Sequence, residues 1–358
     1  MSDRNDKASE TKELSYSRLT THMTCPMLEY YKYRVNGVGL KTTAPYLPFI
    51  EGEVGHYALK FFYKSGLMLR ENMTKRVTKL IDDAGVLDPE ADDDLRTSLA
   101  AMIGICLAYK EKYYTDIDHT SEGKVTSKGI WDILMVEHPF EFEFNGYKFR
   151  GMIDLLVRDR KTLKTTLVEH KFTSSQLAGR LQQLPMDLQE MVYCEAVKQE
   201  TGKYPDFKMW NFIKKSQLRR KKMGDTGREP LTSFEARVQQ QYKEEPDKMF
   251  MRSNPIPVES KMIESVKAQL VKVLRDFEST DPTMRFSSCL GLYGRVCEFI
   301  QACTAKLMEH ADGWNAPECQ GLYKMKECQH EELKEDDDGK CKKPVGKFSE
   351  AKAATARK

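Results

Sequence analysis

Two acidic side chains and one basic side chain stand in neighbouring apolar segments, and their types suit a metal-dependent reaction. Asp154 interrupts the apolar run 152–157, so its carboxylate is expected in a buried strand, where an unpaired charge is costly. Glu169 and Lys171 flank His170 at the end of the next apolar segment. Because side chains alternate along a strand, Glu169 and Lys171 are expected on one face and His170 on the other.

If the two strands are neighbours, Asp154 and Glu169 converge with Lys171. Two close carboxylates repel each other unless a cation lies between them, and the hard divalent ions Mg²⁺ and Mn²⁺ prefer oxygen ligands. Such an ion polarises a phosphoryl group and activates water, and a lysine ammonium stabilises charge developing on the phosphate. The pattern therefore indicates phosphodiester hydrolysis. The alternative is two solvent-exposed acids paired loosely with lysine, since D…E-x-K spacings are common by chance.

Two further short patterns flank this segment. Gly52 to His56 reads G-x-x-x-H in an expected helix, and Gln189 to Tyr193 reads Q-x-x-x-Y in another. With G-x-x-D ending at Asp154 and E-x-K after it, the chain resembles the PD-(D/E)XK nuclease superfamily. It is most similar to the RecB-like exonuclease branch, which includes the iron–sulfur nucleases of CRISPR adaptation and related phage and recombination exonucleases. The resemblance covers roughly residues 15–304.

This resemblance implies a restriction-endonuclease-like fold and assigns roles to the motif residues. The metal ligands it implies are His56, Asp154, Glu169 and the backbone carbonyl of His170. It implies that Lys171 is the catalytic lysine, and that Gln189 and Tyr193 face the site and the nucleic acid. Taken alone, a single histidine more often packs or caps a helix. Gln189 and Tyr193, one helical turn apart, would also share a face as ordinary surface residues.

The elements expected around these residues form a mixed α/β core. Asn145-Gly146 separates two strand patterns and is a strong hairpin signal. A third strand, a helix over 181–200 and a strand over 207–213 follow, giving the order strand, strand, strand, helix, strand. We expect a disordered lead over 1–13, a nuclease domain over 14–304 and a flexible charged tail over 305–358. Within the nuclease domain, 60–128 is expected as a helical subdomain and 133–214 as the catalytic core.

A basic run follows the last core strand, with six Lys and Arg residues among the nine positions 214–222. The overall net charge is only +3, so any grip on nucleic acid must come from such a local patch. Phosphate contacts are expected from Lys214, Lys215, Arg219 and Arg220. The alternative is a solvated surface loop.

The chain has nine cysteines, and its start is polar and charged, so we expect no signal peptide and an intracellular protein. No apolar run approaches the roughly 20 residues that span a membrane. Disulfides are rare in such proteins, so a metal or cluster is the first question for the cysteines. Cys106 and Cys194 lie in apolar helical stretches and are expected to be packed thiols.

The iron–sulfur nucleases of this branch carry one cysteine near the N-terminus and three after the nuclease core. The resemblance therefore implies a [4Fe–4S] cluster joining the N- and C-terminal parts through Cys25, Cys289, Cys297 and Cys303. The last spacing, C-x5-C, agrees, whereas the preceding C-x7-C is longer than the common C-x2-C. Four thiolates also suit Zn²⁺, so the metal stays open. A small zinc site is the weaker interpretation of Cys319, Cys328 and Cys341 in the tail.

Together these patterns favour a Mg²⁺- or Mn²⁺-dependent DNA exonuclease that acts on single strands or DNA ends in recombination, replication or repair. Phage origin and a helicase or recombinase partner stay open. The alternatives are a non-catalytic DNA-end-binding module of the same fold and an RNA-directed nuclease, since no reader of the 2′-hydroxyl is recognisable.

Overall fold

The computed structural model describes most of the chain, in two compact units. The described residues are 12–42, 47–68, 70–84, 89–121, 124–174, 187–224, 227–277, 282–289, 297–308 and 313–326. The first unit consists of Met1–Tyr16 and Pro45–Val271, and the second of Ser17–Ala44 and Lys272–Lys358. No helix in the described part of the chain combines the length and the apolar character that crossing a membrane requires.

A seven-stranded mixed sheet forms the centre of the first unit. Its strands are β1 (Lys12–Ser15), β5 (Trp131–Phe144), β6 (Tyr147–Asp159), β7 (Thr165–Thr173), β8 (Phe207–Lys214), β11 (Phe250–Arg252) and β12 (Ile256–Pro257). The β5–β6 and β6–β7 pairs are antiparallel, whereas β7 and β8 are parallel, with α7 (Leu188–Thr201) between them in the chain. Strands β11 and β12 both pair antiparallel with β8.

One edge of β6 has a break in its pairing, and this break determines where the site lies. Along that edge β6 pairs with β1 as far as Arg150 and with β7 only from Leu155 onward. The stretch between, which contains Asp154, has no ladder partner on this edge. Strand β7 leaves β6 after Val168 and continues beside β8 to Thr173. The sheet is therefore forked, and backbone groups at the fork are available to side chains.

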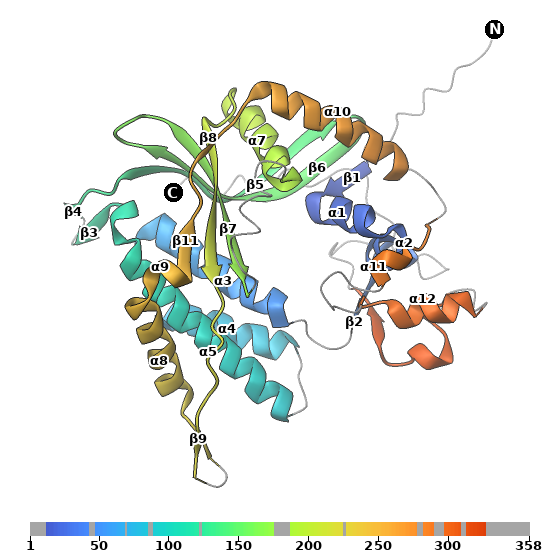
Figure 1. The fold of residues 1–358 in the computed structure, drawn as a ribbon, viewed down its shortest axis with the longest axis horizontal. Coiled ribbons are helices and arrows are strands. Elements are labelled where there is room, and N and C mark those ends of the chain that lie inside the picture. Colours follow the sequence, from blue (N-terminus) through green and yellow to red (C-terminus); the bar gives the residue numbers. More distant parts are fainter. Residues whose placement is uncertain are drawn as a thin grey trace. The chain divides into compact units, whose positions relative to one another are not determined.

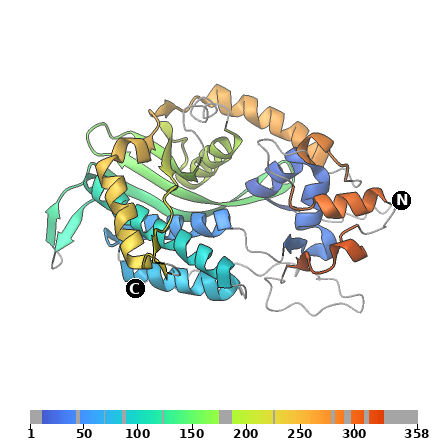
Figure 2. The same ribbon diagram turned by 60° about the horizontal axis from the view of Figure 1, so that its bottom comes forward.

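Helices cover both faces of the sheet (Figures 1 and 2). On one face lie α3 (Leu47–Ser65), α4 (Arg70–Ala84) and α5 (Pro89–Lys112), with α8 (Leu231–Glu244) packed on α5. On the other lie α7 and the part of α10 (Ser260–Phe277) that belongs to this unit. The main core joins α3, α5 and α8 to the sheet through residues such as Phe62, Leu99, Val168, Ile213 and Phe250. Each such fully buried side chain contributes about 1.5–3 kcal/mol of transfer free energy.

Local sequence explains the boundaries of the key elements. Asn145 and Gly146 both have positive φ, 51° and 77°, as a two-residue type I′ hairpin requires. Asp187 caps α7 by accepting a hydrogen bond from the Glu190 backbone N–H, and Gly202 ends the helix with φ 80°. The expected hairpin and the expected order of three strands, a helix and a strand are confirmed.

The second unit is built from chain segments that are far apart in sequence. Its helices are α1 (Tyr16–Thr24), whose first residue belongs to the first unit, α2 (Pro26–Tyr33), α11 (Phe286–Cys289) and α12 (Ile300–Leu307). Strand β2 (Leu40–Thr42) pairs antiparallel with β13 (Tyr323–Met325). Short 3₁₀ turns at Val35–Gly37 and Pro317–Cys319 complete the unit. Pro26 opens α2, with Cys25 as its N-cap residue.

Three boundaries differ from the sequence-based expectation. Residues 12 and 13, expected in the lead, belong to β1 and pair with β6. In the expected helical subdomain, β3 (His119–Ser121) and β4 (Lys124–Ser127) form a hairpin after the 3₁₀ turn Tyr114–Asp116. Residues 313–326, expected in the flexible tail, contain a 3₁₀ turn and β13, because Ala316 and Cys319 pack into the core of the second unit. The lysine- and acid-rich stretch from 327 onward lies outside the described residues.

The remaining short elements lie beyond the central sheet. Strands β9 (Lys222–Met223) and β10 (Gly227–Arg228) form a two-stranded ribbon, and α9 (Pro246–Met249) precedes β11.

Candidate metal centre

Acidic residues from three strands lie at the fork of the sheet. The β5–β6 register pairs Val136 with Leu155 and His138 with Ile153, so Glu137 stands opposite Asp154. On the other side, the β6–β7 ladder ends at Leu155 and Val168, so Glu169 is the first residue of β7 beyond the fork. Directly opposed residues of antiparallel strands project from the same face. Glu137 and Asp154 therefore share a face, and among the described residues the group of possible metal ligands that includes Asp154 consists of His56, Glu137 and Asp154, without Glu169.

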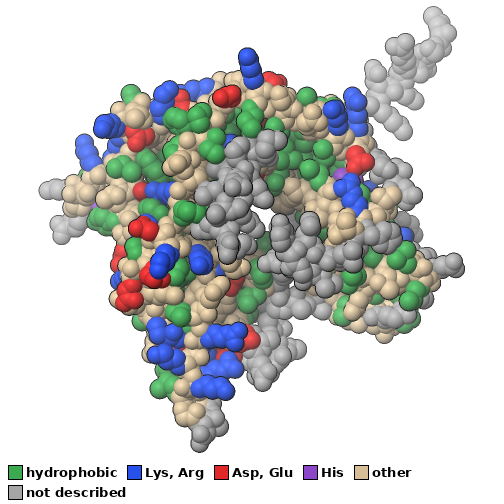
Figure 3. Space-filling view, viewed as in Figure 1, with side chains coloured by type: hydrophobic (Ala, Val, Ile, Leu, Met, Phe, Trp, Pro, Cys, Tyr) green, Lys and Arg blue, Asp and Glu red, His purple; other side chains and the backbone are tan. Residues whose placement is uncertain are grey.

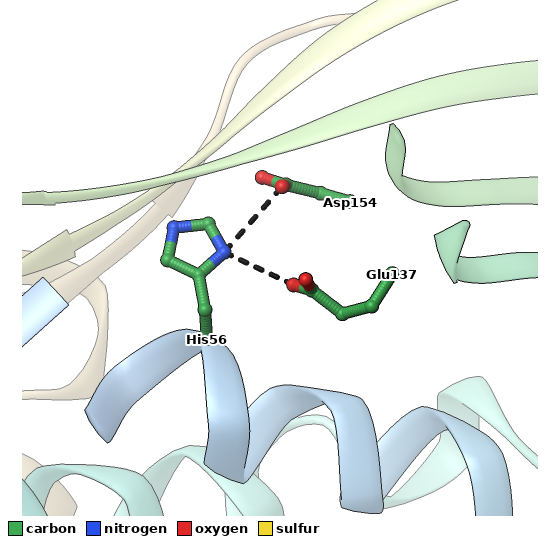
Figure 4. A group of neighbouring side chains, drawn as sticks. All are labelled: His56, Glu137 and Asp154. Atoms are coloured by element: carbon green, nitrogen blue, oxygen red, sulfur yellow. Dashed lines mark hydrogen bonds and ion pairs between the residues drawn. The ribbon is translucent and has the colours of Figure 1, made fainter. Parts of the chain in front are cut away.

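Helix α3 adds an imidazole to Glu137 and Asp154 (Figure 4). His56 Nδ1 lies 3.2 Å from Glu137 Oε1 and 3.4 Å from Asp154 Oδ1. The three side chains offer ligand atoms that all lie within 4.8 Å of one another. Glu137 has a left-handed backbone, with φ 44°, which is uncommon for a residue with a side chain. Such backbone conformations concentrate at functional sites, where the surrounding structure maintains them.

Glu169 and Lys171 form a second group with helix α7. Lys171 Nζ donates hydrogen bonds of 2.6 Å to Glu169 Oε1 and to Gln189 Oε1. Gln189 Nε2 donates to the same Glu169 oxygen at 2.7 Å and to the Tyr193 hydroxyl at 2.9 Å. Tyr193 is buried, and its ring contacts Phe140 at 5.3 Å between centroids. Gln189 and Tyr193 therefore hold the acid and the lysine in place.

His170 points away from this group, as strand alternation predicts. Its backbone N–H donates a 2.8 Å hydrogen bond to Asp154 Oδ2. This contact exists because β7 has left β6 at the fork, which frees the amide. Its ring is buried on the opposite face, stacked on Tyr63 with the centroids 5.6 Å apart. Burial lowers the pKa of His170 to about 3, so the ring is neutral.

The positive charge of His56 balances part of the negative charge of the nearby carboxylates. Burial alone would lower the pKa of His56, but the Asp154 carboxylate outweighs it and, with Glu137, raises that pKa to about 10. Burial would raise the pKa of Asp154, yet His56 and the hydrogen bond from His170 hold it at about 2. In the metal-free protein His56 is therefore an imidazolium between two carboxylates.

The pKa of Glu169 is shifted in the opposite direction from that of Asp154. Burial and the neighbouring Asp154 charge raise its pKa to about 8, against the opposing effect of Lys171. The pKa of Lys171 is raised despite burial, because Glu169 and Asp154 favour the ammonium. Glu169 Oε1 accepts the hydrogen bonds described above, whereas Oε2 is buried with no partner among the described residues.

These residues fit a hard divalent ion. An ion would replace the proton on Glu169 and give its buried oxygen a partner. Carboxylate oxygens and one neutral imidazole form a donor set that Mg²⁺ and Mn²⁺ accept. The ligands available are Asp154, Glu169, His56 and Glu137, with the His170 carbonyl nearby in the chain.

Glycines allow the close approaches that build the centre. A Cβ on Gly55 would lie 2.2 Å from the Phe172 ring, so α3 can approach β7 only without a side chain there. A Cβ on Gly151 would lie 2.6 Å from the ring of Phe140, its partner on β5. Gly52, the glycine of the G-x-x-x-H pattern, faces open space with no atom within 4 Å of a built Cβ.

The basic run forms an arm after β8, and part of its charge is already neutralised (Figure 3). Lys215 pairs with Glu51 and Arg220 with Asp93, so these two expected phosphate contacts also tie the arm to α3 and α5. Arg219 is exposed and Lys214 is half-buried. Lys221 and Lys222 are exposed as well, and Lys and Arg side chains gather in Figure 3 around this part of the molecule.

Four cysteines of the second unit share one buried cluster. Cys25, Cys303 and Cys319 are buried in it, and Cys297 packs against it. The Cys25 sulfur accepts a hydrogen bond of 3.4 Å from the Arg285 backbone N–H. The backbone of Cys289 ends α11, but its side chain lies outside the described part, as do Cys328 and Cys341. Cys106 and Cys194 are buried in helices, as expected of packed thiols.

The sequence analysis did not identify Glu137, and it grouped Cys319 with the cysteines of the tail. The signal for Glu137 was present, because counting back from the Asn145-Gly146 turn with a constant register places it opposite Asp154. Cys319 is separated from the other cysteines by an acid- and tryptophan-containing stretch that was assigned to the tail. Only the packing of Ala316 and Cys319 in the second unit reveals that it belongs with them.

Comparison with known proteins agrees with the geometry. The sequence model of the PD-(D/E)XK nuclease superfamily matches residues 13–304, which include every residue of the metal centre. No curated protein matches the chain. The match spans most of the 358 residues, and the mixed sheet flanked by helices is that of a restriction-endonuclease-like fold. The chain belongs to the PD-(D/E)XK nuclease superfamily.

Proposed function

We propose that this member of the nuclease superfamily is a Mg²⁺- or Mn²⁺-dependent DNA exonuclease of the RecB-like branch, acting on single strands or DNA ends. The observation that supports the proposal is the group of His56, Glu137 and Asp154 at the forked sheet, with Glu169 and Lys171 paired on the neighbouring strand β7. Glu169 is only 3% exposed and has one oxygen with no partner among the described residues, which is costly without a cation.

Each residue then has a chemical task. When bound, the divalent ion supplies Lewis acidity toward the phosphoryl oxygen and lowers the pKa of a water molecule. Asp154, Glu169 and the neutral form of His56 are the ligands we assign to it, with Glu137 and the His170 carbonyl beside them. Lys171 stabilises the charge on the scissile phosphate. Gln189, which also contacts Glu169 and Tyr193, fixes the direction of the Lys171 side chain.

Nucleic acid would reach this centre past the basic arm. Arg219, Lys221 and Lys222 are exposed and form no ion pair with another described residue, so they can contact phosphates directly. The paired Lys215 and Arg220 would have to leave Glu51 and Asp93 first, or would act by holding the arm in position. Recombination, replication or repair of DNA is the setting that the branch suggests.

The test is cleavage of end-labelled substrates with and without Mn²⁺. We expect wild type to degrade DNA only with the metal, and Asp154→Asn to be inactive although folded. Asp159→Asn is the matched control, because Asp159 lies on the same strand but binds the turn residue Thr162. Metal-dependent cleavage retained by Asp154→Asn would refute the proposal. If wild type binds DNA without cleaving it, the non-catalytic DNA-end-binding module is favoured. If wild type cleaves only RNA, the RNA-directed nuclease is favoured.

We further propose a [4Fe–4S] cluster held by Cys25, Cys289, Cys297 and Cys303. Support comes from the burial of Cys25 and Cys303 in one group against which Cys297 packs, together with the N-cap position of Cys25 and its contact with a backbone N–H. Helix N-termini and N–H donors stabilise thiolates. Cys319, in the same group, competes with Cys289 for the fourth position.

The cluster predicts a brown protein with broad visible absorption that Cys303→Ala abolishes. Single alanine variants of Cys289 and Cys319 distinguish the fourth ligand, because only replacement of a ligand removes the colour. A colourless protein that contains stoichiometric zinc would establish a zinc site instead.

A further inference from the structure

A continuous chain of buried hydrogen bonds runs beneath the metal centre, on the face of the sheet that His170 occupies. It begins at the His170 ring, passes through Asn211 on β8, and continues through Tyr109 on α5 and Tyr63 on α3. It ends at the buried carboxylate of Asp116. None of these contacts was assigned a role by the nuclease chemistry described above.

The first link joins two adjacent strands. His170 and Asn211 are cross-strand partners in the β7–β8 register, and both side chains are almost fully buried. The Asn211 amide nitrogen lies 2.8 Å from His170 Nδ1 and donates a 2.7 Å hydrogen bond to the Tyr109 hydroxyl. The Asn211 amide therefore contacts the ring edge of His170 and holds the plane of the imidazole.

The second link joins the strands to the helices. The hydroxyls of Tyr109 and Tyr63 lie 2.7 Å apart, and Tyr63 donates a 3.1 Å hydrogen bond to Asp116. Tyr63 also stacks on the His170 ring, with 12° between the two planes. It follows His56 along α3 by seven residues, which at 3.6 residues per turn places both side chains on one face of the helix.

Arg252 closes the far end of the chain. Its guanidinium donates to both carboxylate oxygens of Asp116 and to the two tyrosine hydroxyls. It lies 3.6 Å from the Tyr113 ring centroid and 4.6 Å from that of Trp131. A buried charge pair with this many partners is held in one geometry, and removing one partner is expensive. The anchor is therefore rigid.

We infer that Asn211, Tyr109 and Tyr63 are positioning residues that set the divalent-ion affinity of the centre. This inference deepens the proposed nuclease function. The His170 ring is held on one side, and its backbone N–H binds Asp154 on the other. Tyr63 fixes α3 against the same ring, and α3 carries His56. The network thus fixes the position of His56, on the helix, relative to Asp154, on the sheet.

Hydrogen bonds can hold the ligands in a way that apolar packing cannot. An apolar contact of the same volume would bury similar area, but it would leave the rotation of His170 and the sliding of α3 unspecified. Hydrogen bonds are directional, and metal sites lose about 10–100-fold in affinity when the partners behind their ligands are removed. Each bond adds only about 1 kcal/mol of net stability, so its effect on the metal is separable from its effect on folding.

The experiment is Mn²⁺ titration followed by the electron paramagnetic resonance signal of the free ion. The variants are Asn211→Leu and Tyr109→Phe, the second of which keeps its ring. The matched control is Tyr242→Phe, which removes a buried hydroxyl that bonds the Lys214 carbonyl in the same unit. We expect both network variants to bind Mn²⁺ about 10-fold more weakly. We also expect higher Mn²⁺ to restore most of their cleavage rate, and the control to match wild type.

Folding is monitored by thermal denaturation, and Tyr109→Phe decides the matter if Asn211→Leu fails to fold. Folded network variants with wild-type Mn²⁺ affinity would overturn the inference while leaving the nuclease proposal intact. Equal weakening by Tyr242→Phe would overturn it too, because the effect would then be general loosening. A wild type that binds no Mn²⁺ would refute both this inference and the proposed function.

Discussion

At the scale of single side chains, the raised pKa values of His56 and Glu169 keep both groups protonated at the proposed metal site. His56 carries a proton between Asp154 and Glu137, and Glu169 keeps one through burial beside Asp154. If these groups bind a metal ion, both protons must leave first. We therefore expect metal binding to be coupled to proton release.

Calorimetry of Mn²⁺ binding will reveal this coupling. With pKa values of about 10 for His56 and about 8 for Glu169, both groups are protonated at neutral pH. We expect release of about two protons per ion at pH 7, falling to about one in His56→Gln. Titrations in buffers of different ionisation enthalpy measure the number. Release of no proton by wild type would contradict the assigned ligands.

The raised pKa of Glu169 also makes the stability of the metal-free protein depend on pH. Its pKa is raised from 4.5 to about 8, so the folded state holds the proton more tightly than the unfolded state. The linked stabilisation is complete below about pH 4.5 and is lost as pH rises through about 8. We expect the Tm of wild type to fall relative to Glu169→Gln across this range in the presence of EDTA. Parallel pH profiles of the two proteins would be the contrary result.

Lys171 should act on the reaction and not on the fold. Its ammonium lies beside Glu169 and Gln189, 26% exposed, where a phosphate can reach it. We expect Lys171→Met to lower the cleavage rate about 10²–10³-fold while DNA binding persists. Lys164→Met, which removes an exposed lysine paired with Asp206, serves as the control and should cleave normally. Comparable loss in both variants would argue against a specific role.

Between helix and strand, the decisive contact is the approach of α3 to β7. Gly55, and not the motif residue Gly52, lies against the Phe172 ring. We expect Gly55→Ala to cost about 1–3 kcal/mol and to weaken Mn²⁺ binding, because α3 carries His56. Gly52→Ala, on the same helix in open space, should be neutral or stabilise by up to about 1 kcal/mol. Urea unfolding and Mn²⁺ titration of the pair measure both effects, and a reversed order would contradict the packing.

The sequence was sufficient for much of this arrangement because local rules decide it. Strand alternation separated His170 from Glu169 and Lys171, and the Asn145-Gly146 turn set the hairpin. The fork in the sheet was not predictable, because the pairing of β1 with β6 joins segments far apart in sequence. Neither was the left-handed backbone of Glu137, since no glycine or turn pattern marks that position.

For the chain as a whole, the division into two units separates the two proposed metal sites. The divalent-ion centre lies within Pro45–Val271, and the cysteine group within Ser17–Ala44 and Lys272–Lys358. The second unit unites distant segments, so a cluster in it would close a long loop and remove much unfolded-state entropy in the simple model. We therefore expect the cysteine group to affect stability and the carboxylates to affect the reaction.

This separation can be tested in one variant. We expect Cys303→Ala to lower the Tm of the second unit while the Mn²⁺ affinity of the folded first unit stays within about twofold, since the two groups of residues belong to different compact units. Calorimetry and Mn²⁺ titration of the same preparation provide both values. Loss of Mn²⁺ binding in a protein whose first unit is folded would show that the two sites are coupled.

The most direct measurement is the anomalous difference density of crystals grown with Mn²⁺. The account predicts a peak within coordination distance, about 2.0–2.6 Å, of carboxylate oxygens from both Asp154 and Glu169 and of a His56 ring nitrogen. Asp154→Asn crystals should lose the peak. A peak elsewhere and none at this position would contradict the proposed metal centre, as would a fully occupied ion that Glu169 does not coordinate.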